Sequence, residues 1–81
     1  MTSKLASHEV ERVLEHLRDT MRRKDWSQLE VQRELGWGRS YISQLMTRQK
    51  MLRVEQVLMI LSVIGVTPAE FYHGLYSETW D

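Results

Sequence analysis

The chain has 81 residues, of which 27% are charged, and its 11 Lys and Arg balance its 11 Asp and Glu. This length fits one domain, which we expect to occupy residues 1–81 with an ordered core over about residues 8–76. Cysteine is absent from the sequence, which excludes disulfides, zinc–thiolate sites and cysteine nucleophiles.

The first predicted helix follows an apolar stripe. Its apolar side chains recur at the i, i+3, i+4, i+7 spacing of an amphipathic helix; they are Val10, Val13, Leu14, Leu17 and Met21. Ser7 is a candidate N-cap, and the basic residues 22–24 suit the negative end of the helix dipole.

The second helix has a well-defined start. Ser27 and Glu30 have the spacing of a capping box, and Trp26 and Val31 that of a hydrophobic staple. Gly36 can adopt the left-handed conformation that ends a helix, so we expect this helix to be short.

A third helix is expected from Arg39 to about Arg48, with Gly38 as its N-cap. Ile42 and Leu45 form its inner face. The polar residues of this helix then point mostly outward; they are Ser40, Tyr41, Ser43, Gln44 and Thr47.

Two further helices complete the predicted all-α fold. Val54–Ile64 is apolar on most sides, so we expect it to be buried on most sides, and Gly65 ends it. Thr67 and Glu70 form a second capping box with Pro68 at the first helical position, which starts a helix reaching about Tyr76.

The charge is unevenly distributed. Residues 18–53 hold nine Lys and Arg against four Asp and Glu, whereas residues 54–81 hold four acidic residues and no Lys or Arg. A basic middle between acidic ends indicates a surface that faces a polyanion. The longest apolar run, residues 57–66, is far below the roughly 20 residues that span a bilayer. No secretory signal is visible near residue 1, so we expect a cytoplasmic protein without a membrane partner.

Two short helices joined by a tight, glycine-containing turn are typical of a helix-turn-helix. In this motif the second helix enters the DNA major groove while the first braces it across the backbone. Arginine matches guanine and glutamine matches adenine, so Arg39 and Gln44 suit base recognition, and Ser40 and Ser43 are adaptable hydrogen-bonding groups.

The stretches 26–28, 35–45 and 61–68 resemble the phage lambda repressor and Cro type (XRE-like) of helix-turn-helix family. This resemblance implies a compact five-helix DNA-binding domain with the helix-turn-helix at its second and third helices. It implies a phosphate contact for Gln28 and base contacts for Arg39, Ser40 and Tyr41, followed by Ser43 and Gln44. Further phosphate contacts are expected from residues beside the third helix, namely Thr47, Arg48, Lys50 and Arg53.

Some positions depart from the family pattern or leave alternatives open. Gln32 stands where many members have alanine, so it either leans outward or alters the angle between the two helices. Met46, Arg48 and Leu52 replace the Glu, Gly and Pro that often follow the recognition helix. Tyr41 is equally compatible with a DNA contact and with packing over the turn.

The last two helices carry more apolar side chains than one small core needs, which favours a homodimer over a well-filled monomer. The predicted interface residues are Met59, Ile60, Val63, Phe71, Tyr72, Leu75, Tyr76 and Trp80. A dimer suits a palindromic operator, so we expect a transcriptional regulator, most simply a repressor or autoregulator. The alternative is a helix-turn-helix scaffold that binds a protein partner, as an antitoxin or anti-regulator does.

Enzymatic and metal-binding functions are not expected. His8, His16 and His73 lack the spacing of metal ligands, and no pairing of nucleophile and base is visible. We therefore predict no catalytic residues, no metal and no cofactor.

Overall fold

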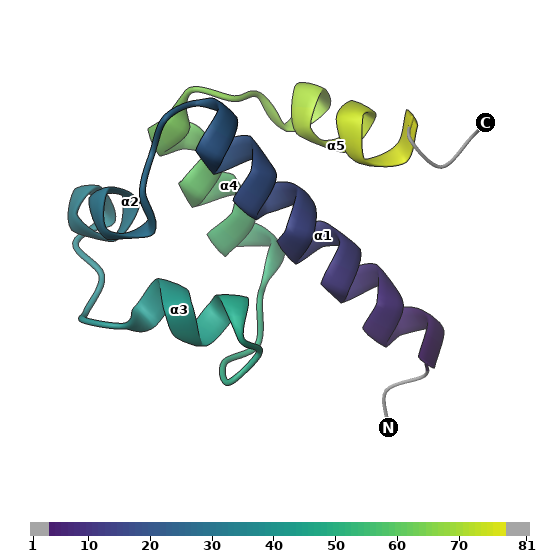
Figure 1. Ribbon diagram of the computed structural model, residues 1–81, viewed down its shortest axis with the longest axis horizontal. Coiled ribbons are helices and arrows are strands. Elements are labelled where there is room, and N and C mark those ends of the chain that lie inside the picture. The colour runs from purple at the N-terminus through teal and green to yellow at the C-terminus, as the bar shows by residue number, and fades with distance from the viewer. Residues whose placement is uncertain (1–3, 78–81) are drawn as a thin grey trace.

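The computed structural model describes residues 4–77, which form five α-helices (Figure 1). These helices are α1 (Lys4–Arg23), α2 (Gln28–Leu35), α3 (Tyr41–Met46), α4 (Val54–Ile64) and α5 (Pro68–Ser77). The long α1 runs through the molecule, with α2 and α3 gathered towards its C-terminal end and α5 on its other side. Within the described residues no strand occurs, and the predicted all-α, five-helix fold is confirmed.

The core collects one apolar face from each helix. On α1 the buried residues are Leu14, Leu17 and Met21, while Val10 and Val13 are half-buried against the same cluster. Helix α2 packs on α3 and α4, and α5 packs on α1 and α4. The other buried apolar side chains are Val31, Ile42, Leu45, Met46, Val57, Ile60, Leu61, Ile64, Val66, Phe71 and Leu75.

Both predicted capping boxes are present. The Ser27 hydroxyl accepts a hydrogen bond from the Glu30 amide at 3.1 Å, and the Glu30 carboxylate accepts one from the Ser27 amide at 2.9 Å. Hydrogen bonds that the Glu30 carboxylate makes with the backbone amide and the side chain of Ser27 lower the pKa of Glu30 below its ordinary value. They therefore stabilise the fold at neutral pH and are lost as the pH falls through the lowered pKa. Thr67 and Glu70 make the corresponding pair of bonds at the start of α5.

Left-handed backbone ends two helices at the predicted residues. Gly36 has φ 68° after α2, and Gly65 has φ 76° after α4. Glycine adopts this conformation without the steric penalty of a Cβ atom. The chain can therefore change direction sharply between α2 and α3 and between α4 and α5.

Two helix boundaries differ from the prediction. Helix α1 begins at Lys4, so Ser7 lies inside the helix and is not its N-cap. Helix α3 spans only Tyr41–Met46, because Ser40 and Arg48 on either side of it adopt positive φ values of 67° and 64°. Its N-cap is Ser40 and not Gly38.

Helix α4 is buried on one face and not on most sides. Val57, Ile60, Leu61 and Ile64 follow the i, i+3, i+4, i+7 spacing and are at most 5% exposed. Three other apolar side chains of α4 are exposed: Val54, Leu58 and Met59. The sequence prediction was wrong here because α4 carries more apolar residues than α1, α2 and α5 can cover.

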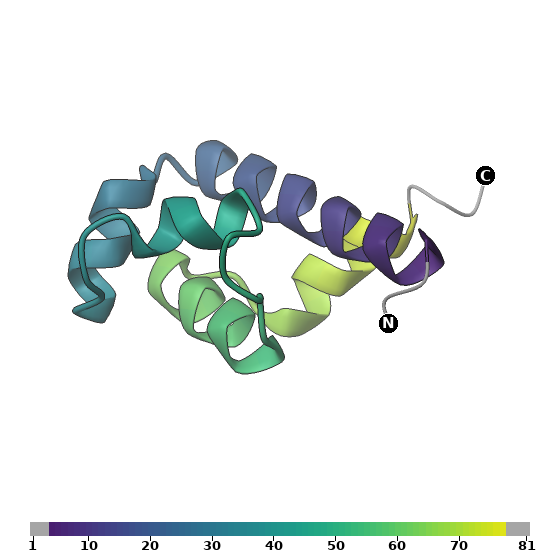
Figure 2. The same cartoon turned by 90° about the horizontal axis from the view of Figure 1, so that it is seen from below.

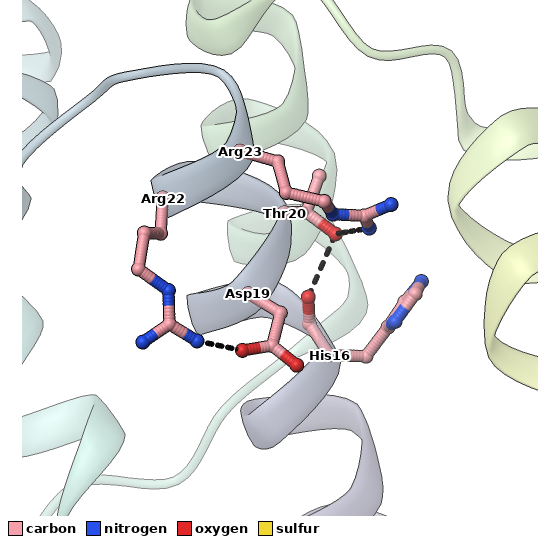
Figure 3. A network of polar contacts seen from close by, with 5 residues as sticks. All are labelled: His16, Asp19, Thr20, Arg22 and Arg23. Atoms are coloured by element: carbon pink, nitrogen blue, oxygen red, sulfur yellow. Dashed lines mark hydrogen bonds and ion pairs between the residues drawn. The ribbon is translucent and has the colours of Figure 1, made fainter.

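Polar side chains near the end of α1 bond mainly within that helix (Figure 3). The Thr20 hydroxyl donates to the His16 carbonyl at 2.7 Å and accepts from Arg23 at 3.2 Å, while Arg22 pairs with Asp19. Two of the cations in the basic middle of the sequence are thus held on α1.

Gly74 allows α5 to approach α1 closely. A Cβ atom at this position would lie 3.1 Å from Nε2 of His16, closer than most Cβ contacts in proteins. That nitrogen also lies 3.0 Å from the Phe71 carbonyl oxygen. The small side chain at residue 74 therefore permits the contact between His16 and α5.

We expect Gly74→Ala to destabilise the protein, although alanine is the better helix former by about 1 kcal/mol. The added methyl group must displace the buried His16 ring, and overpacking costs about 1–3 kcal/mol. Thermal unfolding followed by circular dichroism would measure the change. A variant with a raised melting temperature would show that His16 moves aside freely.

Within residues 4–77 no single helix has the length and apolar character needed to cross a membrane. Taken together, α4 and α5 pass such a test by length and composition, but they are bent by 107° relative to each other.

Candidate DNA-binding surface

Helix α3 lies at the outer edge of the molecule with α2 behind it (Figures 1 and 2). Ile42, Leu45 and Met46 point into the core, which turns the polar side of the helix outward. Arg39, Ser40 and Ser43 are exposed, and Gln44 is half-buried. The local sequence therefore presents most of the predicted base-reading side chains on one accessible surface.

The hydroxyl groups on this surface are anchored to the backbone. Ser43 donates to the Ser40 carbonyl at 3.0 Å, and Thr47 donates to the Ser43 carbonyl at 2.8 Å. Each hydroxyl oxygen keeps its capacity to accept a hydrogen bond. These two residues therefore suit donors on a ligand, such as the exocyclic amines of bases.

Tyr41 is held by residues of the protein itself. Its ring centroid lies 4.7 Å from that of Trp37, and the Lys50 ammonium lies 5.7 Å from its centroid. Its hydroxyl accepts a hydrogen bond from Nε2 of Gln56 at 2.5 Å. Of the two roles predicted for Tyr41, the structure favours packing over the turn.

The arginines predicted to contact DNA, whether at bases or at phosphates, fall into two groups. The guanidinium of Arg48 donates to the Ser7 hydroxyl at 2.8 Å and pairs with Glu11 of α1 at 3.4 Å. By contrast, Arg39 and Arg53 are exposed and make no ion pair with any residue that the structure describes. Arg39 and Arg53 are thus the cations best placed to meet an anion without breaking an existing contact.

Gln28 and Thr47 are the two uncharged residues predicted to contact phosphates. Gln28 is the first residue of α2 and is half-buried, whereas Thr47 is exposed and directly follows α3. The helix-turn-helix thus places a polar residue at the start of its first helix and others along and after its second.

The comparison with known families agrees with this geometry. A sequence profile described as helix-turn-helix matches residues 17–71, from within α1 to within α5. The chain belongs to the lambda repressor-type helix-turn-helix family. Members are DNA-binding transcriptional regulators and not, as a class, enzymes. No curated protein and no solved structure gave a significant match.

Two glutamines contribute to this helix-turn-helix in ways that the sequence did not reveal. Gln32 is buried, and its side-chain oxygen accepts a hydrogen bond from the Ile42 amide at 3.2 Å. Gln56 accepts from the Arg53 amide at 2.6 Å while it donates to Tyr41. The spacing of Arg53 and Gln56 is that of a capping box, but arginine is not a usual cap residue, so the signal was weak.

The structure corrects part of the predicted dimer interface. Ile60, Phe71 and Leu75 are at most 5% exposed, because α5 folds back on α1 and α4, so they belong to the core of one copy. Met59 and Tyr76 are exposed. Val63 and Tyr72 are half-buried, and Trp80 lies outside the described residues.

Proposed function

We propose that this family member is a sequence-specific regulator of transcription that binds a palindromic operator in double-stranded DNA as a homodimer. Its most direct action is repression, including repression of its own promoter. The observation that carries the proposal is the exposed polar side of α3. Arg39 lies directly before this helix, is exposed and makes no ion pair with any described residue.

The base contacts follow from side-chain chemistry. The Arg39 guanidinium matches O6 and N7 of guanine, and the Gln44 amide matches N6 and N7 of adenine. Ser40 and Ser43 add short, adaptable hydrogen bonds. Helix α3 is then the recognition helix, lying in the major groove with its N-terminal turn nearest the bases.

Contacts to the DNA backbone would fix the register of this helix without reading sequence. Gln28, Thr47 and Arg53 are the candidate contacts, and Thr47 would contact a phosphate by turning its hydroxyl proton away from the Ser43 carbonyl. Lys50 can extend beyond the Tyr41 ring. Arg48 can join them by exchanging Glu11 for a phosphate, since their ion pair is exposed and therefore weak.

A second copy supplies the length of site that one α3 lacks. Six residues of helix extend about 9 Å, which covers roughly three base pairs at 3.4 Å each. The exposed apolar side chains of α4 (Val54, Leu58, Met59) are ones that a second copy would cover, with Leu58 and Met59 each 40% exposed. Tyr76, with 42% exposure, adds an aromatic ring on α5.

In vitro selection from random duplex DNA tests the proposal, with selected sites titrated by fluorescence anisotropy at several salt concentrations. We expect a two-fold-symmetric motif bound far more tightly than random DNA, with affinity falling steeply as salt rises. Sedimentation should give a dimer at tens of micromolar. A monomer there, or a motif without symmetry, would contradict the dimer and leave DNA recognition standing.

A protein-interaction module is the second candidate, because the chain is electrically neutral and leaves Met51 77% exposed. If selection enriches no site and every duplex is bound weakly, this alternative gains support. The same scaffold would then act as an antitoxin or anti-regulator.

A further inference from the structure

The side chain at the N-cap position of α3 does not cap the helix. Ser40 occupies the N-cap position, but its left-handed backbone, with φ 67°, leaves its side chain without a capping hydrogen bond. The first amides of any helix have no partner within that helix and need one from elsewhere. A six-residue helix has few internal hydrogen bonds, so the stability of α3 depends strongly on partners for its first amides.

Gln32 of α2 supplies the missing acceptor. Its side-chain oxygen lies 3.2 Å from the amide nitrogen of Ile42, ten residues further along the chain. Gln32 is only 8% exposed, so water has little access to replace this bond. The backbone carbonyl of the same residue accepts from the Trp37 amide at 3.0 Å. One residue therefore binds both the turn after α2 and the first turn of α3.

We propose that Gln32 is a positioning residue that sets the orientation of the recognition helix and, through it, the choice of bases. The proposal rests on the DNA-binding function proposed above. Arg39 and Ser40 lie directly before α3, so any change in its first turn moves them relative to the base edges. Gln32 faces the interior and touches no DNA itself.

Hydrogen bonding, and not only packing, is required at this position. An aliphatic side chain fills similar space but leaves the Ile42 amide without its acceptor, and a buried unpaired amide is costly. The helix then relieves that cost by tilting or by fraying its first turn. A carboxylate keeps the acceptor and is favoured at the positive end of the helix dipole.

Three variants separate this role from general stability. Gln32→Leu removes the acceptor, Gln32→Glu keeps it, and Thr67→Ala removes a side-chain cap at the start of α5, away from α3. For each folded variant, the ratio of affinities for the selected site and for random duplex is measured. Hydrogen exchange of the Ile42 amide, followed by NMR, reports the contact without DNA.

We expect Gln32→Leu to lower the affinity ratio about tenfold and to speed exchange at Ile42. In Gln32→Glu the affinity ratio and the slow exchange at Ile42 should both be mostly retained. Thr67→Ala should lower the melting temperature while leaving the affinity ratio unchanged. An unchanged ratio in folded Gln32→Leu overturns the proposal, as does loss of the ratio in Gln32→Glu. Should Gln32→Leu not fold, Gln32→Glu decides alone. A wild-type chain that selects no site contradicts the proposed function instead, and the exchange of Ile42 still tests the cap.

Discussion

Replacing Phe71 with alanine is expected to lower the free energy of unfolding by about 3–5 kcal/mol, the range for large aromatic truncations in a core. Phe71 is 1% exposed, and its ring centroid lies 4.8 Å from that of His16 and 5.1 Å from that of Tyr72. It joins α5 to α1, so its loss leaves a cavity between two helices. Such a loss is comparable to the whole stability of many small domains, about 5–15 kcal/mol.

Urea denaturation followed by circular dichroism measures this effect. Tyr76→Ala is the matched control, because Tyr76 is an aromatic residue on the same helix but is 42% exposed, with its ring near the Arg12 guanidinium. We expect this control to lose less than about 1 kcal/mol. Equal losses in the two variants would mean that α5 does not contribute a core aromatic residue.

Local signals in the sequence located most helix boundaries. The capping boxes at Ser27 and Thr67 depend on residues three positions apart, and Gly36 and Gly65 act through their own backbone. Such features are complete within a few residues, so no knowledge of the tertiary structure is needed to predict them. They were sufficient to place α2 and α3 as a helix-turn-helix.

The boundaries of α3 could not be predicted in the same way. The amide of Ile42 in its first turn is capped by Gln32 from another helix, and its ends depend on positive φ values at Ser40 and Arg48. Serine and arginine give no local signal for that conformation. The sequence therefore indicated a recognition helix but made it longer than the six residues observed.

Three of the predicted dimer-interface residues, Ile60, Phe71 and Leu75, lie in the core for a related reason. On α4, overlapping apolar stripes fit the helical period, and periodicity alone does not say which of them meets the core. The packing of α2 and α5 decides that Ile60 is buried and that Leu58 stays partly exposed. The exposed apolar area that the proposed second copy could cover is consequently smaller than predicted.

The Lys and Arg side chains in the basic middle of the sequence make different kinds of contact in the structure. Arg22 and Arg23 bond within α1, and Arg48 binds Ser7 and Glu11. Arg39 and Arg53 make no ion pair among the described residues. Arg18, Lys24 and Arg33 also lack an ion pair among those residues. The excess of positive charge therefore predicts a segment, and the position of Arg39 directly before α3 and of Arg53 directly before α4 distinguishes these two cations within it.

Replacing Arg39 or Gln44 with alanine is expected to weaken binding to the selected site by about 1–3 kcal/mol each, or roughly 10–100-fold. Each side chain would lose a bidentate contact to one base, so affinity for random duplex should change much less. Both side chains lie on the surface of the helix-turn-helix and leave the core unchanged, so the fold should persist. Anisotropy titrations on the selected site, on sites altered at single base pairs and on random duplex measure these differences.

Arg53→Ala provides the matched comparison, because Arg53 is also an exposed arginine without an ion pair among the described residues. As a phosphate contact it should weaken binding to all duplexes alike and reduce the slope of log affinity against log salt by about 1. If Arg39→Ala behaves in this uniform way, Arg39 contacts the backbone and α3 lies in a different orientation in the groove. If it relaxes the preference at one base pair, that base pair identifies where the N-terminal turn of α3 meets the DNA.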